Sequence, residues 1–126
     1  MSIFTIFISF FIGWLVPGLS IGNYSSAQSN ALDIERKNDI NAIYQKLEVY
    51  YNENGDYPTS DKLVYKTIET LPGLDEESLR DPGGVFINQN GDYLYEPVDC
   101  TALGCAQYTL SAKLGDGTEY TKLSLN

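Results

Sequence analysis

The stretch that decides the fold is DIERKNDINAIYQKLEVYYNENGDYPT, residues 33–59. Its apolar side chains recur at three- and four-residue steps, with most of the charged ones between them, which is the period of a half-buried helix. Asn54 and Gly55 then supply a residue that tolerates positive φ, and Pro58 prevents any continuation. The pattern predicts an amphipathic helix over 33–54. Its buried face consists of Ile40, Ile43, Tyr44, Leu47, Tyr50 and Tyr51.

The chain before this stretch has no charged side chain, the first being Asp33. Residues 3–21 are mostly apolar and, as a helix, long enough to cross a hydrocarbon core of about 30 Å. We therefore expect residues 1–32 to form an apolar transmembrane or assembly helix ahead of a soluble domain, 33–126. A cleaved secretory signal, cut near Ser25-Ser26-Ala27, is the alternative, although no Lys or Arg precedes the apolar run. A buried core helix has too little protein to cover it.

The net charge is −9, and the chain has no histidine. Sequence-independent nucleic-acid binding needs clustered Lys and Arg, which this acidic chain lacks, so no direct nucleic-acid partner is expected. Without histidine the usual general base is missing and a structural zinc site is nearly excluded. We expect no enzymatic activity.

The tail changes to a period of two. After a connector, 55–83, residues 85–87 and 93–95 flank Asn90-Gly91, which favours a two-residue hairpin turn. Residues 107–114 and 118–125 flank a second turn, Gly115-Asp116-Gly117. The prediction is an α+β fold in which a four-stranded antiparallel sheet, 84–126, covers the apolar stripe of the helix.

The two cysteines, Cys100 and Cys105, lie in the loop expected between the hairpins. A close pair in an exported domain favours a disulfide over the alternative, two reduced thiols in a cytosolic protein. Asn88, Asn90 and Asp92 place oxygens at alternate positions, which suggests calcium, but the rest of a calcium loop is missing and a hairpin turn also explains them.

Three segments resemble the type IV pilin and type II secretion pseudopilin superfamily: DIERKNDINAI at 33–43, LEVYYNENGDYPT at 47–59 and YTLSAKL at 108–114. The resemblance implies a structural subunit of a pilus or pseudopilus-like filament. Its partners would be other copies or related pilins and a pilus assembly platform. It would reside as a single-pass membrane protein before assembly and then in an extracellular filament at the cell surface.

The same resemblance places Met1 where the family's mature chain begins, and Thr5 where most members carry a glutamate that pairs with a neighbour's terminal amine. Loss of that glutamate is known mainly in minor subunits. The resemblance also implies assembly through the large apolar side chains of the front, and it makes Asp99 and Asp116 calcium candidates beside Asp92. The assembly residues are Met1, Phe4, Thr5, Phe7, Phe10, Phe11 and Trp14.

The alternative function is a membrane-anchored or secreted monomeric binding or adhesion module. Ten tyrosines would favour it if several were exposed together. We expect instead that most of them pack between helix and sheet. The tyrosines expected there are Tyr44, Tyr50, Tyr51, Tyr93, Tyr95 and Tyr108.

Overall fold

A computed structural model describes the chain from residue 21 to residue 126, with side chains from residue 26. The predicted assembly residues, from Met1 to Trp14, and most of the predicted membrane helix lie outside the described residues. Within residues 21–126, no helix is both long enough and apolar enough to cross a membrane. The chain divides into two compact units, Met1–Ala31 and Leu32–Asn126, and the fold below is that of the second.

Helix α2 (Ile21–Asn54) ends where the sequence predicts. Gly55 adopts a φ of 81°, and its N–H donates to the Tyr51 carbonyl at 2.7 Å, which satisfies an orphan carbonyl of the last turn. On this helix Asp33 pairs with Arg36 at 2.8 Å. Arg36 also reaches Asp92 at 3.2 Å, so tertiary contact selects this partner.

The connector holds three short helical turns, α3 (Ser60–Tyr65), α4 (Thr67–Thr70) and η2 (Glu76–Leu79). Thr59 caps α3 by accepting from the Lys62 N–H at 3.4 Å. Asp75 caps η2 in the same way, through the Glu77 N–H at 3.1 Å. Buried Leu63, Leu71 and Leu79 attach these turns to the core.

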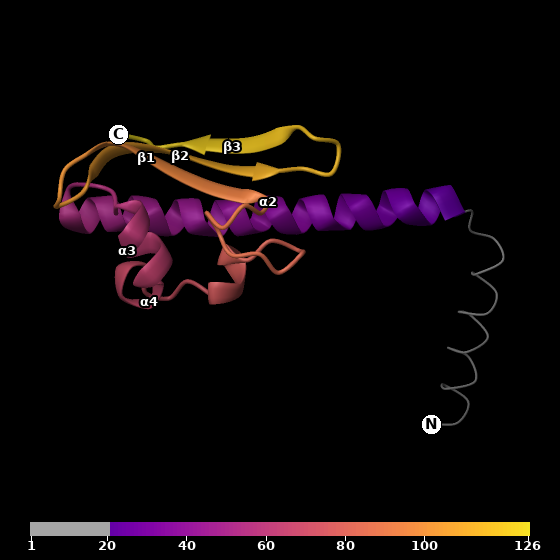
Figure 1. The fold of residues 1–126 in the computed structure, drawn as a ribbon, viewed down its shortest axis with the longest axis horizontal. Coiled ribbons are helices and arrows are strands. Elements are labelled where there is room, and N and C mark those ends of the chain that lie inside the picture. The colour runs from indigo at the N-terminus through magenta and orange to yellow at the C-terminus, as the bar shows by residue number, and fades with distance from the viewer. Residues whose placement is uncertain (1–20) are drawn as a thin grey trace, which may run out of the picture. The chain divides into compact units, whose positions relative to one another are not determined.

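The sheet has three antiparallel strands, β1 (Tyr93–Cys100), β2 (Cys105–Lys113) and β3 (Glu119–Leu123), in the order β1-β2-β3 (Figure 1). The predicted fourth strand at 85–87 is wrong, because in that segment only an isolated bridge joins Phe86 to Arg80. The β2–β3 hairpin agrees with the prediction.

Side chains replace the missing strand at the edge of β1. The Asn88 amide donates to the Tyr95 carbonyl at 3.0 Å and accepts from the Tyr95 N–H at 2.8 Å. Buried Asp81 accepts from the N–H groups of Val85 and Asp92 at 2.9 and 2.8 Å. These bonds hold 81–92 as a folded loop. Asn88 N–H donates to the Tyr93 carbonyl, so the connection before β1 is wider than the predicted two-residue turn.

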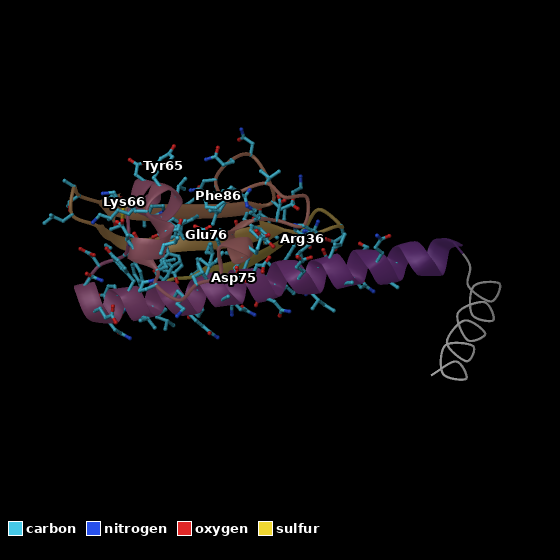
Figure 2. The ribbon with its side chains drawn as sticks, turned by 90° about the horizontal axis from the view of Figure 1, so that it is seen from below. Arg36, Tyr65, Lys66, Asp75, Glu76 and Phe86 are labelled. Atoms are coloured by element: carbon cyan, nitrogen blue, oxygen red, sulfur yellow. A yellow bond between two sulfur atoms is a disulfide. The ribbon has the colours of Figure 1, made fainter. Side chains whose placement is uncertain are left out.

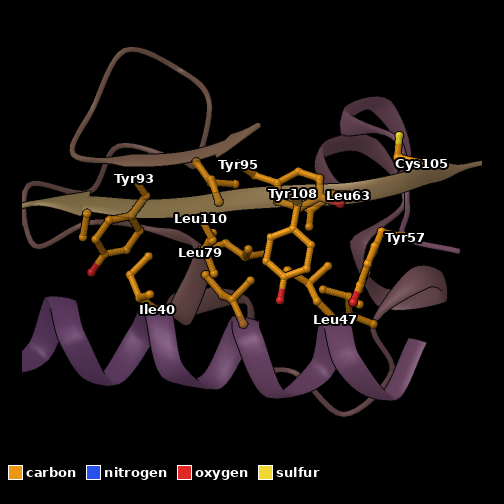
Figure 3. Packing of buried hydrophobic residues seen from close by; sticks show 14 residues of the cluster. Ile40, Leu47, Tyr57, Leu63, Leu79, Tyr93, Tyr95, Cys105, Tyr108 and Leu110 are labelled. Carbon is orange, nitrogen blue, oxygen red and sulfur yellow. The ribbon is translucent and has the colours of Figure 1, made fainter. Parts of the chain in front are cut away.

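The core lies between the second half of α2 and the inner face of the sheet (Figure 3). From the helix come Ile40, Ile43 and Leu47, all fully buried as the periodicity predicts. The sheet supplies aromatic rings and apolar side chains from alternate positions. Those buried on the strands are Tyr93, Tyr95, Cys105, Tyr108, Leu110 and Ala112.

Candidate functional site

Glu48, on α2, lies at the centre of a polar cluster between helix and sheet. Its Oε1 accepts from the Tyr57 hydroxyl at 2.8 Å, and its Oε2 accepts from the Tyr108 hydroxyl at 2.7 Å. The Asn126 amide donates to the Tyr57 oxygen at 3.1 Å. The rings of Tyr57 and Tyr108 meet edge to face, with centroids 4.7 Å apart. Because Tyr57 lies in the connector and Tyr108 on β2, these two hydrogen bonds join both segments to α2.

Two further tyrosines extend this arrangement along α2. Tyr93 donates to Asp39 Oδ2 at 2.6 Å, and Tyr120 donates to Asn41 Oδ1 at 2.8 Å. Strands β1, β2 and β3 are therefore each tied to the helix by a tyrosine hydroxyl. Because buried hydroxyls are costly without a partner, these bonds also fix the register of sheet on helix.

Burial changes the protonation chemistry of these groups. Desolvation raises the pKa of the Tyr108 hydroxyl first, and the hydrogen bond to Glu48 raises it further. Desolvation likewise raises the pKa of Asp39, and the Tyr93 hydrogen bond offsets part of that rise. The carboxylates of Glu35, Asp75 and Glu77 add to the rise by repulsion. Because burial raises the pKa values of Tyr57, Tyr93 and Tyr108, these three hydroxyls stay neutral hydrogen-bond donors near neutral pH.

The tyrosine prediction is confirmed in its main point. Tyr93, Tyr95 and Tyr108 are buried, and Tyr44, Tyr50 and Tyr51 pack partly buried against the core. Sequence reasoning missed Tyr57, which is also fully buried. A signal for it was present, since an aromatic residue directly after a helix stop and before proline is well placed to fold back on that helix.

The predicted disulfide between Cys100 and Cys105 is present. Its place differs from the expectation. The cysteines end β1 and begin β2 as partners in the strand register, so the bond closes one hairpin and does not sit between two. Cys105 also bridges to Tyr57 through both backbone groups, at 2.8 Å each, which links the disulfide to the aromatic cluster.

Two of the three calcium candidates serve other contacts, and the third lies far from one of them. Asp92 pairs with Arg36, and Asp116 accepts from the N–H and hydroxyl of Thr118 at 2.9 and 2.6 Å. Asp99 lies next to Cys100 at the opposite end of the β1–β2 ladder from the turn that holds Asp116. In the part of the chain that the structure describes, no three acidic, cysteine or histidine side chains are grouped as a metal site.

A shallow groove of about 360 Å³ opens beside α3 and α4. Figure 2 labels four of its lining residues, Tyr65, Lys66, Glu76 and Phe86. Tyr65 and Ile68 line it with 77% and 68% of their surface exposed, and Phe86 forms another wall. The Arg80 guanidinium lies 5.4 Å from the Phe86 ring centroid. The lining includes two cations, Lys66 and Arg80, and two carboxylates, Glu69 and Glu76, so it carries no net charge. Sequence reasoning missed this groove because its walls come from separate segments.

Comparison with protein-family models, curated proteins and solved structures finds no match for the chain.

Proposed function

We propose that this chain is a structural subunit of a type IV pilus or pseudopilus-like filament. The observation that supports the proposal is the layout of α2. The described part of this helix, Ile21–Asn54, has 34 residues and follows the apolar sequence, and its second half supplies the buried stripe for the sheet. In sequence, the apolar front therefore precedes a compact acidic domain that includes the second half of this helix.

The physics of assembly follows from this layout. Apolar helices that leave a bilayer can bury their surface only against one another. Repetition of one head-to-tail contact gives an open helical filament, with the acidic domains as its outer shell. The subunit would wait as a single-pass membrane protein and enter an extracellular filament through an assembly platform.

The second unit has features that suit such a role. Its disulfide leaves no free cysteine in the chain, which fits an oxidising, extracellular setting. Each strand is tied to α2 by a tyrosine hydroxyl, so the domain stays fixed on the helix that would carry it in a filament.

The test uses Thr5, because a threonine cannot neutralise a buried terminal amine as glutamate would. Filaments are sheared from cells that express the wild type, Thr5→Glu or Thr5→Gln, and the chain is counted by quantitative mass spectrometry. Few wild-type copies, increased by Thr5→Glu and unchanged by Thr5→Gln, indicate a minor subunit. Many wild-type copies indicate that packing of the apolar side chains is sufficient for incorporation into the filament. Absence of the wild type and of Thr5→Glu from every filament fraction contradicts the proposal.

The groove beside α3 and α4 favours a second candidate, a membrane-anchored or secreted binding module. Exposed Tyr65 and Ile68 are apolar groups that a ligand could cover. This candidate predicts that Tyr65→Ser abolishes cell adhesion while the protein stays monomeric in detergent. Leu103→Ser, at an equally exposed apolar position away from the groove, is the matched control.

A further inference from the structure

Three glycines in this chain follow a residue whose side-chain carbonyl can react with them: Gly55 after Asn54, Gly91 after Asn90 and Gly117 after Asp116. The glycine backbone nitrogen can attack the preceding side-chain carbonyl carbon and close a five-membered succinimide. Glycine favours this attack because no side chain shields its nitrogen. The reaction also needs a nitrogen and a side chain that no hydrogen bond holds. The three sites differ sharply in that respect.

At the first site both reacting groups are held. The Asn54 side-chain amide donates to the Tyr50 carbonyl at 3.0 Å, and the Gly55 N–H donates to the Tyr51 carbonyl at 2.7 Å. These bonds form the C-terminal cap of α2. Attack by the Gly55 nitrogen therefore requires both hydrogen bonds to break and the last turn of α2 to unwind.

At the Asp116 site the electrophile is the side-chain carboxyl group, which is a poor electrophile and is also held by hydrogen bonds. Hydrogen bonds from Thr118 to the carboxylate lower the pKa of Asp116, so the side chain is ionised and resists nucleophilic attack. The Gly117 N–H donates to the Leu114 carbonyl at 3.0 Å. At this site, therefore, neither the attacking Gly117 nitrogen nor the Asp116 carboxyl group is free to react.

The Asn90 site is open. Asn90 is exposed in a left-handed conformation, with φ of 68°. Among the hydrogen bonds that the structure describes, neither the Asn90 side chain nor the Gly91 N–H has a partner. The restraints lie on either side of the pair, at Asn88 and at Asp92.

The fold also requires glycine at position 91. A β-carbon there would clash with Asp81 Oδ2 and would stand 2.7 Å from the Val85 side chain, closer than real contacts allow. At Gly55 and Gly117 the corresponding space is empty. The tight loop around Asp81 therefore excludes any side chain that would shield the nucleophile.

We propose that Asn90 is the principal deamidation site of this protein. The Gly91 nitrogen bonds to Asn90 Cγ, the Cγ–Nδ2 bond breaks, and the proton lost by the Gly91 nitrogen leaves with Nδ2 as ammonia. Water then opens the succinimide at either carbonyl and gives aspartate or isoaspartate. The sum is asparagine plus water to an acidic residue plus ammonia, with no change of oxidation state.

The two products differ in their effect on the loop. Aspartate adds one negative charge near Asp81 and Asp92. Isoaspartate also lengthens the backbone by one methylene between the Asn88 bonds to β1 and the Asp81 bond to Asp92. The isoaspartate form should lose the clamp on the edge of β1, whereas an Asn90→Asp variant should keep it.

The test is to age the full-length protein in detergent, in mildly alkaline buffer at physiological temperature, and map its peptides by mass spectrometry. The folded protein should convert Asn90 at least about tenfold faster than Asn54, since each held group must first lose a hydrogen bond. Denatured protein should convert both at similar rates. Equal rates in the folded protein, or faster conversion at Asn54, would overturn the proposal.

Two variants separate the site from its consequences. Asn90→Gln should stop the main deamidation and leave the slow rate at Asn54 unchanged. If its total deamidation equals that of the wild type, Asn90 is not the site. Hydrogen exchange of the Tyr95 amide should accelerate in the isoaspartate form and stay slow in Asn90→Asp. Equal protection in both forms would overturn the inference about the clamp.

Discussion

Tyr108 on β2 donates its hydroxyl hydrogen to Glu48 on α2 across 2.7 Å. The two residues lie 60 positions apart in sequence, so only the folded chain brings them together. Tyr57 donates to the other oxygen of the same carboxylate at 2.8 Å. These two hydrogen bonds link the connector and β2 to one side chain of α2.

Glu48→Ala should lower the free energy of unfolding by roughly 2–4 kcal/mol, because the hydroxyl hydrogens of Tyr57 and Tyr108 lose their acceptor. Denaturant unfolding followed by circular dichroism measures the change. Glu53→Ala, an exposed carboxylate on the same helix, is the matched control and should stay within about 0.5 kcal/mol of the wild type. Equal effects of the two substitutions would show that the Glu48 bonds contribute nothing.

Asp81→Ala should destabilise the protein by about 2–4 kcal/mol, because the N–H groups of Val85 and Asp92 lose their acceptor. Asp81→Asn retains one acceptor oxygen and should lose less. Amide hydrogen exchange offers a local measurement, in which Val85 and Asp92 lose protection before the β2–β3 ladder does. Uniform loss of protection across the sheet would contradict this.

Cys100→Ser combined with Cys105→Ser should cost about 2 kcal/mol in the chain-entropy model, because the bond closes only a short loop. The fold should persist, since the β1–β2 ladder continues over Tyr93 to Val98 without the bond. Circular dichroism and thermal unfolding measure both effects. Complete loss of folded signal in the double variant would show that the bond is essential.

The Asp39 carboxyl should make the protein less stable as pH rises. Burial raises its folded pKa above the ordinary 3.8, so the folded state holds the proton more tightly than the unfolded one. The free energy of unfolding therefore falls between about pH 3.8 and the raised pKa, and levels off above it. In Asp39→Asn this fall should be absent.

Unfolding of the wild type and Asp39→Asn across that pH range isolates the contribution of this group. Tyr93→Phe removes a hydrogen bond that lowers the Asp39 pKa, so the fall should extend to higher pH in that variant. A difference between wild type and Asp39→Asn that is independent of pH, or of opposite slope, would contradict the expectation.

Local chemistry predicts much of this fold from the sequence. The end of α2 at Asn54, the cap at Thr59 and the β2–β3 hairpin depend on neighbouring residues only. The disulfide also follows from sequence separation and composition. The groove lined by Tyr65 and Phe86 could not be predicted, because no periodicity brings its two segments together.

The predicted fourth strand, which the structure lacks, shows where inference from neighbouring residues fails. Residues 85–87 are apolar and precede a favoured turn, and such a segment suits a strand by propensity. Buried Asp81 competes for the same backbone groups, and Asn88 takes the hydrogen bonds of Tyr95 that a strand would have made. Hydrogen bonds to the Asp81 carboxylate, from N–H groups four and eleven residues along the chain, outweigh a propensity difference of about 1 kcal/mol.

By itself, the sequence determined the period of α2, its end at Asn54, and the apolar stripe of Ile40, Ile43 and Leu47, because these depend on side chains within one or two turns. The tertiary structure decided which polar groups those elements share. Glu48 receives Tyr57 and Tyr108, and Asp81 replaces a strand, only because burial removes water as a partner and leaves the nearest protein group as the alternative.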